Sequence, residues 1–326
     1  MKPFKFQKTK SVSEAVAGKN ERSRFVAGGT NLIDLMKKHI SEPDMLVDVT
    51  SGLSSAITQN ASGLRIGAMA RNTTVANDEL VKEHAGLVSK AILAGASPQI
   101  RNMASTAGNL LQRTRCPYFY DISLPCNKRK EGSGCGALES ENRTSAIIGH
   151  NEHCVAVHPS DMCVAMAALD VNVIATGKDS KETIIPFKDF HRLPGDNAEL
   201  DNTLPADSVI TAVDIPKNKF NSNNAYVKVR DRDSYAFALI SVAAGLNLEG
   251  NRIVDARLAS GGVAHKPWRW YETEKFLAGK EATSKVFSEA AEIAIADTKP
   301  LAGNKFKVPM LKGAIEVALQ NCLTIK

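Results

Sequence analysis

The chain has 326 residues, of which 43% are hydrophobic and 23% charged, and its formal net charge is +6. This composition is typical of a globular protein with room for two or three domains. Aromatic residues make up only 6% of the chain and no basic block is flanked by them, so we expect no nucleic-acid partner. No run approaches the roughly eighteen apolar residues of a membrane span, so we expect none.

The hydrophobic pattern predicts two successive units in the first part of the chain. In the first unit, we expect a helix, strand, turn, helix and strand at 12–17, 23–27, 28–30, 31–39 and 45–49. The second unit begins with a strand at 64–68 and a helix at about 76–94. After a cysteine-rich segment, it resumes with a helix at 160–169 and strands at 171–175 and 208–215.

The pattern changes after residue 215. The polar, turn-rich residues 216–224 are predicted to form a linker. Beyond them we expect strands at 225–230, 236–248 and 253–259 and then helices at 268–277, 285–296 and 307–323. Strands followed by helices indicate an α+β domain with a helical layer on one antiparallel sheet.

Four of the six cysteines lie within 39 residues: Cys116, Cys126, Cys135 and Cys154. The segment is rich in Pro, Gly and basic residues and lacks helical periodicity before the fourth cysteine. Loops of this kind can present four thiolates from different directions, so the segment is interpreted as an iron–sulfur site. The basic run 128–130 could offset the negative charge of a thiolate cluster, although such runs are more often solvated loops.

Other roles for the cysteines stay open. Structural zinc usually has closely paired cysteines, whereas the gaps here are nine, eight and eighteen residues. Disulfides would need an oxidising compartment, and His153 and His158 flank Cys154 as alternative ligands. Cys163 and Cys322 lie in apolar helical patterns, where a thiol behaves as a small hydrophobic group.

Two glycine-containing turns precede the cysteine segment. Phe25 and Val26 lead from a strand into the first turn and the helix start, residues 27–32. The second turn, residues 101–112, again supplies small residues, hydroxyls and an Asn amide. Each could be a plain tight turn, but together they could clasp a pyrophosphate, because glycine lets backbone amides approach an anion at a helix N-terminus.

A third element follows at residues 158–162, where Ser160 suits a helix N-cap and Asp161 could bind a nucleotide ribose. We find no Gly-x-Ser-x-Gly, His-Glu-x-x-His or EF-hand motif, and the seven histidines are scattered. The combination suggests an electron-transfer flavoprotein. A stand-alone flavin oxidase and a scaffold protein are the alternatives, although a scaffold would leave the turns and cysteines unexplained.

The chain resembles the FAD-binding medium subunit of the xanthine dehydrogenase (molybdenum hydroxylase) family, and most closely the FAD/4Fe-4S subunit of bacterial periplasmic aldehyde oxidoreductases. The resemblance spans the whole chain. The stretches that carry it are residues 27–32, 106–121, 125–129, 132–135, 158–162, 228–232, 234–238 and 261–269. One departure is Ala107, which stands where the family usually has glycine and adds a methyl group beside the second turn.

The resemblance implies an α+β architecture with two domains. A two-part FAD-binding domain of the vanillyl-alcohol-oxidase (PCMH) type would occupy residues 1–218, with subdomains at about 1–58 and 59–218 and a 4Fe-4S insertion at 113–155. A domain like the C-terminal domain of carbon monoxide dehydrogenase flavoprotein would occupy residues 219–326.

The resemblance also implies the site residues. The cluster ligands would be Cys116, Cys126, Cys135 and Cys154. The residues expected to bind FAD are Phe25, Val26, Ala27, Gly28, Gly29, Thr30, Asn31, Leu32, Ala68, Ala104, Ser105, Thr106, Gly108, Asn109, Ser160, Asp161 and Lys228.

The implied reaction is the oxidation of an aldehyde to a carboxylic acid in a partner. The expected partners are a large molybdenum-cofactor subunit, a small 2Fe-2S subunit and an external electron acceptor. The FAD subunit of a xanthine or hydroxybenzoyl-CoA type of molybdenum hydroxylase is the alternative within the family. Because residues 1–8 are basic but no apolar stretch follows them, no signal peptide is expected. We therefore expect a periplasmic location by export with a signal-bearing partner, or else a cytoplasmic one.

Overall fold

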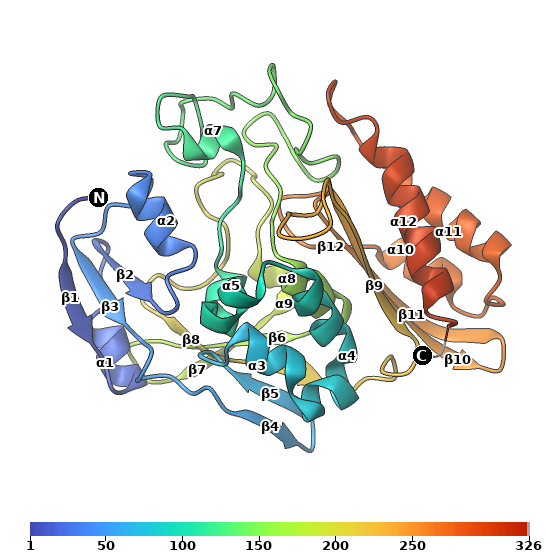
Figure 1. Cartoon of the computed structure of the whole chain (residues 1–326), viewed down its shortest axis with the longest axis horizontal. Coiled ribbons are helices and arrows are strands. Elements are labelled where there is room, and N and C mark those ends of the chain that lie inside the picture. The colour runs from blue at the N-terminus through green and yellow to red at the C-terminus, as the bar shows by residue number, and fades with distance from the viewer. Residues whose placement is uncertain (325–326) are drawn as a thin grey trace.

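The computed structural model describes residues 1–324 and contains three sheets (Figure 1). The first is a small parallel sheet of order β1-β3-β2. Its subdomain consists of β1 (Lys5–Lys8), α1 (Val12–Ala17), β2 (Ser23–Val26), α2 (Leu32–Lys37) and β3 (Met45–Asp48). The alternation of strand and helix therefore gives the predicted order, with the additional edge strand β1.

The second sheet has five antiparallel strands in the order β4-β5-β8-β6-β7. These strands are β4 (Ile57–Asn60), β5 (Gly63–Gly67), β6 (Asn172–Thr176), β7 (Glu182–Pro186) and β8 (Val209–Pro216). The accompanying helices are α3 (Asn72–Asn77), α4 (Glu79–Ala94), α5 (Pro98–Met103), α6 (Thr106–Leu110), α8 (Asp161–Ala168) and α9 (Phe187–Phe190). The cysteine-rich segment projects from this subdomain as loops that carry the short helix α7 (Pro117–Tyr120) (Figure 1).

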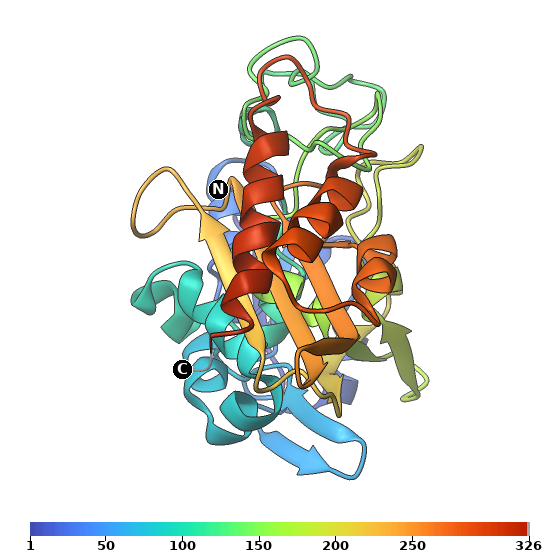
Figure 2. The same cartoon turned by 90° about the vertical axis from the view of Figure 1, so that its right-hand side faces the viewer.

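The third sheet, of order β12-β11-β10-β9, is antiparallel and covered on one face by three helices (Figure 2). Its elements are β9 (Asn224–Val229), β10 (Ile240–Glu249), β11 (Arg252–Gly261), β12 (Trp268–Arg269), α10 (Tyr271–Leu277), α11 (Ser284–Ile295) and α12 (Lys307–Asn321). The prediction of a helical layer on one antiparallel sheet is therefore confirmed.

Strand β10 shows why the two larger parts of the molecule pack together. Ile240, Val242 and Leu246 are buried in the core shared with α11 and α12. Ala243 lies on the other face, in the core shared with α4 and α8. A strand buried on both faces has a run of apolar residues rather than an alternating pattern, and residues 242–246 of β10 form such a run.

Some predicted boundaries are wrong for identifiable reasons. The helix predicted at 76–94 is interrupted at Asp78, which leaves helical geometry and caps α4 by accepting a hydrogen bond from Val81 N. A second break lies inside α4 at Ala85, whose φ of -147° and ψ of 40° are not helical. The helix predicted to start at 268 starts at Tyr271, since Trp268 and Arg269 pair with β11. The strand predicted from 236 begins at Ile240.

The segment predicted as a linker is anchored rather than free. Phe220 is buried in the core of the second sheet, and Asn224 already belongs to β9. Among residues 1–324, no helix is both long enough and apolar enough to cross a membrane.

The two glycine-containing turns meet at Gly28. A Cβ atom built on Gly28 would lie 1.9 Å from the carbonyl oxygen of Met103, at the end of α5. Only glycine permits this close approach of two backbones. The neighbouring Gly29 has φ of +72°, which also favours glycine.

We therefore predict that Gly28→Ala lowers the free energy of unfolding by about 1–3 kcal/mol, because the added methyl group overpacks the contact between the turns. Denaturant unfolding measures the change. Gly313→Ala is the matched control, since nothing lies within 4 Å of its built Cβ in helix α12. Equal stability of Gly28→Ala and the parent protein would contradict the tight contact.

Candidate functional site

A cavity of about 860 Å³ lies where the first two subdomains meet the third sheet. Its wall includes the start of α2, the turn around α6, the start of α8, and the loop that follows β9. Eight of the residues predicted from the sequence line it: Thr30, Asn31, Ala104, Gly108, Asn109, Ser160, Asp161 and Lys228. The structure thus brings together the three separate motifs of the first domain and one lysine of the second.

The other predicted residues do not line this cavity. They are Phe25, Val26, Ala27, Gly28, Gly29, Leu32, Ala68, Ser105 and Thr106. Ser105 caps α6 by accepting a hydrogen bond from Gly108 N at 3.2 Å, and Thr106 Oγ1 donates to Ala70 O at 2.9 Å. These residues shape the turns that the cavity wall consists of.

A chain of side-chain hydrogen bonds fixes the second turn to helix α8. Asn109 Nδ2 donates to Asn72 Oδ1 at 2.9 Å, while Asn109 Oδ1 accepts from Ser160 Oγ at 2.6 Å and from Gln112 Nε2 at 2.7 Å. Ser160 Oγ also accepts from Cys163 N, as the N-cap of α8. The cap predicted for Ser160 is therefore confirmed, and Asn109 is held in one orientation.

Asp161 and Lys228 form a buried ion pair across the domain interface. The carboxylate and ammonium lie 2.8 Å apart, and their side chains are only 9% and 4% exposed. Tyr226 Oη donates to the second carboxylate oxygen at 2.7 Å. Breaking a buried pair costs about 3–5 kcal/mol, against about 0–1 kcal/mol for a surface pair. Tyr226, which the sequence analysis missed, completes this support of the cavity wall.

Arg115 is a second wall residue that the sequence analysis missed. Its guanidinium stacks on the Phe237 ring at 5.2 Å from the centroid and donates to Tyr120 Oη. Within residues 1–324, the buried Nε of Arg115 has no hydrogen-bond partner. A buried donor without a partner is costly. The Nε of Arg115 is therefore a free donor at the cavity wall, while its Nη1 lies 3.9 Å from the carboxylate of Asp34.

The four clustered cysteines come together in a second, smaller pocket. Cys116, Cys126, Cys135 and Cys154 all line it, and the backbones of Cys126 and Cys135 pair as an isolated bridge. Burial raises the pKa of Cys116 to about 11 and that of Cys154 to about 12. Metal or cluster binding at this pocket would therefore release protons from the thiols.

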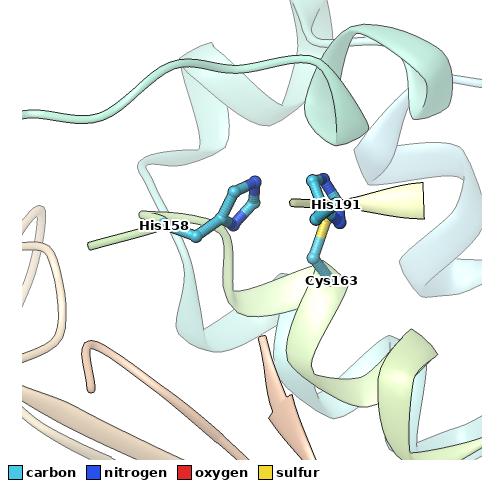
Figure 3. A group of neighbouring side chains, drawn as sticks. All are labelled: His158, Cys163 and His191. Carbon is cyan, nitrogen blue, oxygen red and sulfur yellow. The ribbon is translucent and has the colours of Figure 1, made fainter. Parts of the chain in front are cut away.

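Cys163 lies apart from this pocket, in the core around helix α8. Its thiol approaches two histidines that the sequence had suggested were scattered, His158 and His191 (Figure 3). Burial lowers the pKa of His191 to about 4 and that of His158 well below its usual value, so both rings are neutral. His191 Nε2 donates to Leu110 O, and His158 Nδ1 accepts from Ser160 N. Both rings thus tether loops to the core.

Two family models match successive parts of the chain. Residues 2–218 match the family described as the FAD-binding domain in molybdopterin dehydrogenase. Residues 224–320 match the CO dehydrogenase flavoprotein C-terminal domain.

Curated relatives align over nearly the whole chain. The aldehyde oxidoreductase FAD-binding subunit PaoB of Escherichia coli K12 is 45% identical, with 98% of each chain covered. The glyceraldehyde dehydrogenase medium chain of Sulfolobus acidocaldarius is 26% identical, with 88% of this chain and 85% of the relative covered.

Solved structures share the fold. CO dehydrogenase from Oligotropha carboxidovorans superposes with a TM-score of 0.76 at 23% identity, with 99% of each chain covered. Quinoline 2-oxidoreductase from Pseudomonas putida 86 gives 0.75 at 22% identity, with 99% and 100% covered. The fold class and the family resemblance are therefore confirmed. The chain belongs to the molybdopterin dehydrogenase FAD-binding family and is the FAD subunit of a molybdenum hydroxylase.

Proposed function

We propose that this chain is the FAD- and 4Fe-4S-containing electron-transfer subunit of a molybdenum-dependent aldehyde oxidoreductase. The observation that carries the proposal is the pairing of a cofactor-sized cavity with a four-cysteine pocket. The relative that is 45% identical over the full chain is named as an FAD subunit of an aldehyde oxidoreductase, which supports the substrate class.

The cavity suits FAD in size and chemistry. Its volume of about 860 Å³ falls within the roughly 300–1,000 Å³ range of cofactor sites. Gly108, in the first turn of a capped helix, exposes backbone to the cavity, and Arg115 offers an unpartnered donor. We assign the pyrophosphate to the turns at Thr30–Asn31 and Gly108–Asn109, while Ser160, Asp161 and Lys228 contact the rest of FAD. FAD would supply a carrier that accepts electrons from one centre and passes them to another.

The second pocket suits a four-iron cluster. Four cysteines from well-separated positions of the loops line it. Four such thiolates can bind a cubane cluster, whereas structural zinc usually has closely paired cysteines. The cluster and FAD sites would be adjacent, because Thr114, Cys116 and Ala156 line both pockets. This shared wall supports a role in electron transfer.

The relative that is 45% identical is named as one subunit of an aldehyde oxidoreductase, which supports a function within a complex. We propose a heterotrimer in which a large subunit with the molybdenum cofactor oxidises the aldehyde to the carboxylic acid. A small 2Fe-2S subunit would connect it to this chain, which passes the electrons to an external acceptor. We further propose that the complex is periplasmic and that this chain is exported together with a signal-bearing partner.

Gly108→Val is predicted to weaken FAD binding at least about tenfold, equivalent to about 1.4 kcal/mol. Gly108 lines the cavity, and a Cβ built on it would lie 2.9 Å from Ser105 Oγ, the cap of α6, so a larger side chain would displace this turn of the cavity wall. Flavin fluorescence after release from the purified complex measures the content. Gly313→Val, with open space around its built Cβ, should keep full flavin. Full retention by Gly108→Val would contradict the assignment.

Cys154→Ser should lose iron or alter the electron paramagnetic resonance signal of the cluster, because it removes one of four ligands. Cys163→Ala is the control and should keep four irons per chain, since Cys163 lies in the core of α8. Iron analysis and electron paramagnetic resonance of the two purified variants test whether Cys154 is the fourth ligand. The opposite pattern would show that the fourth ligand is wrongly assigned.

The proposed function also requires partners. The isolated chain, even when it carries flavin, should show no aldehyde-dependent dye reduction, whereas the co-purified complex should show it. The rate of dye reduction with equal amounts of flavin is the measurement. Activity of the single chain would favour a stand-alone flavin oxidase instead.

A further inference from the structure

Lys128 is a buried cation beside the four cysteines. Its side chain is 2% exposed, and it lines the same pocket as Cys116, Cys126, Cys135 and Cys154. It forms an ion pair with Asp201 and donates to Ala198 O at 3.2 Å and His265 Nε2 at 2.9 Å. The ammonium thus links the cysteine insertion to two distant segments.

Asp201 is shared with a second cation. Arg113 Nε donates to Asp201 Oδ2 at 2.6 Å, and the Arg113 guanidinium lies 4.7 Å from the centroid of the Phe119 ring, another part of the pocket wall. Burial alone would raise the pKa of Asp201, but Lys128 and Arg113 hold it well below its usual range. Asp201 is therefore ionised.

His265 adds no charge to this group. Burial and the nearby Lys128 lower the pKa of His265 to about 3. Its Nε2 accepts from Lys128 while its Nδ1 donates to Arg192 O at 3.1 Å, which is the pattern of a neutral ring. We call Arg113, Lys128 and Asp201 the Lys128 charge group. Its two cations and one anion leave an excess of one positive charge.

Arg113 is 26% exposed, but Lys128 is only 2% exposed, and a buried charge is costly unless an opposite charge compensates it. Four thiolates around a cubane cluster leave a net negative charge on the assembly. Net charge close to a cluster is also one of the properties that set its reduction potential.

We propose that the Lys128 charge group is the built-in counter-charge of the thiolate-bound cluster and sets its reduction potential, with Lys128 and Asp201 acting in opposite directions. The inference rests on the cluster of the proposed function. Lys128 stabilises the reduced, more negative cluster, whereas Asp201 moderates that effect. These are positioning residues, since neither is a ligand to iron.

The test uses the complex purified with its partner subunits and measures the cluster potential by a redox titration followed by electron paramagnetic resonance. Lys128→Met should lower the potential and Asp201→Asn should raise it. The double variant, which restores the original net charge, should return close to the parent value. Lys130→Met is the matched control, because it removes the same charge two residues further along, at an exposed position, and should leave the potential unchanged.

The opposite signs of the two shifts distinguish an electrostatic effect from a structural one. If the substitutions acted only by breaking the ion pair between Lys128 and Asp201, both variants would shift the reduction potential in the same direction. Shifts of the same sign, or none, with iron content intact would overturn the inference. If Lys128→Met loses its iron, Asp201→Asn decides: a raised potential supports the inference and an unchanged one overturns it. Absence of iron from the parent complex would instead contradict the proposed function.

Discussion

The structure depends on the burial of helix α8 on all sides. Its N-terminus is capped by Ser160, and its first residue, Asp161, is paired with Lys228 of the other domain. Seven of its eight residues are buried, against α4 on one side and strands β10 and β11 on another. Because a helix that is apolar all round must be enclosed, the two domains cannot separate without exposing it. The cavity of about 860 Å³ lies at the N-terminal end of this helix.

The cysteine insertion uses the same point of the fold. The insertion begins just after the second turn and ends just before α8. Thr114, Cys116 and Ala156 therefore line both pockets. Its loops are anchored partly by apolar contacts, since Phe119 packs with Leu35 and since Ile147 and Ile148 belong to the core of the third sheet. Buried polar groups add to this anchoring of the loops. Lys128 links them to Asp201 and His265, while Lys307 donates to backbone carbonyls of Ser145 and Gly262.

Local signals predicted much of this arrangement. Gly28, Ser160 and Cys154 lie in short motifs. Neighbouring residues in the sequence therefore indicate a tight turn, a helix cap and a cluster of cysteines at these positions. Tyr226 and Asp201 could not be found this way, because their partners lie far away in the sequence. The break at Asp78 was also missed, since helical periodicity continues through it while the cap interrupts the backbone.

The most direct test of the account is anomalous diffraction at the iron absorption edge from crystals of the intact complex. We predict a compact peak for four irons enclosed by Cys116, Cys126, Cys135 and Cys154, with flavin density in the adjoining cavity next to Gly108 and Lys228. An empty cysteine pocket in an iron-replete preparation, or flavin density outside the cavity, would contradict the account.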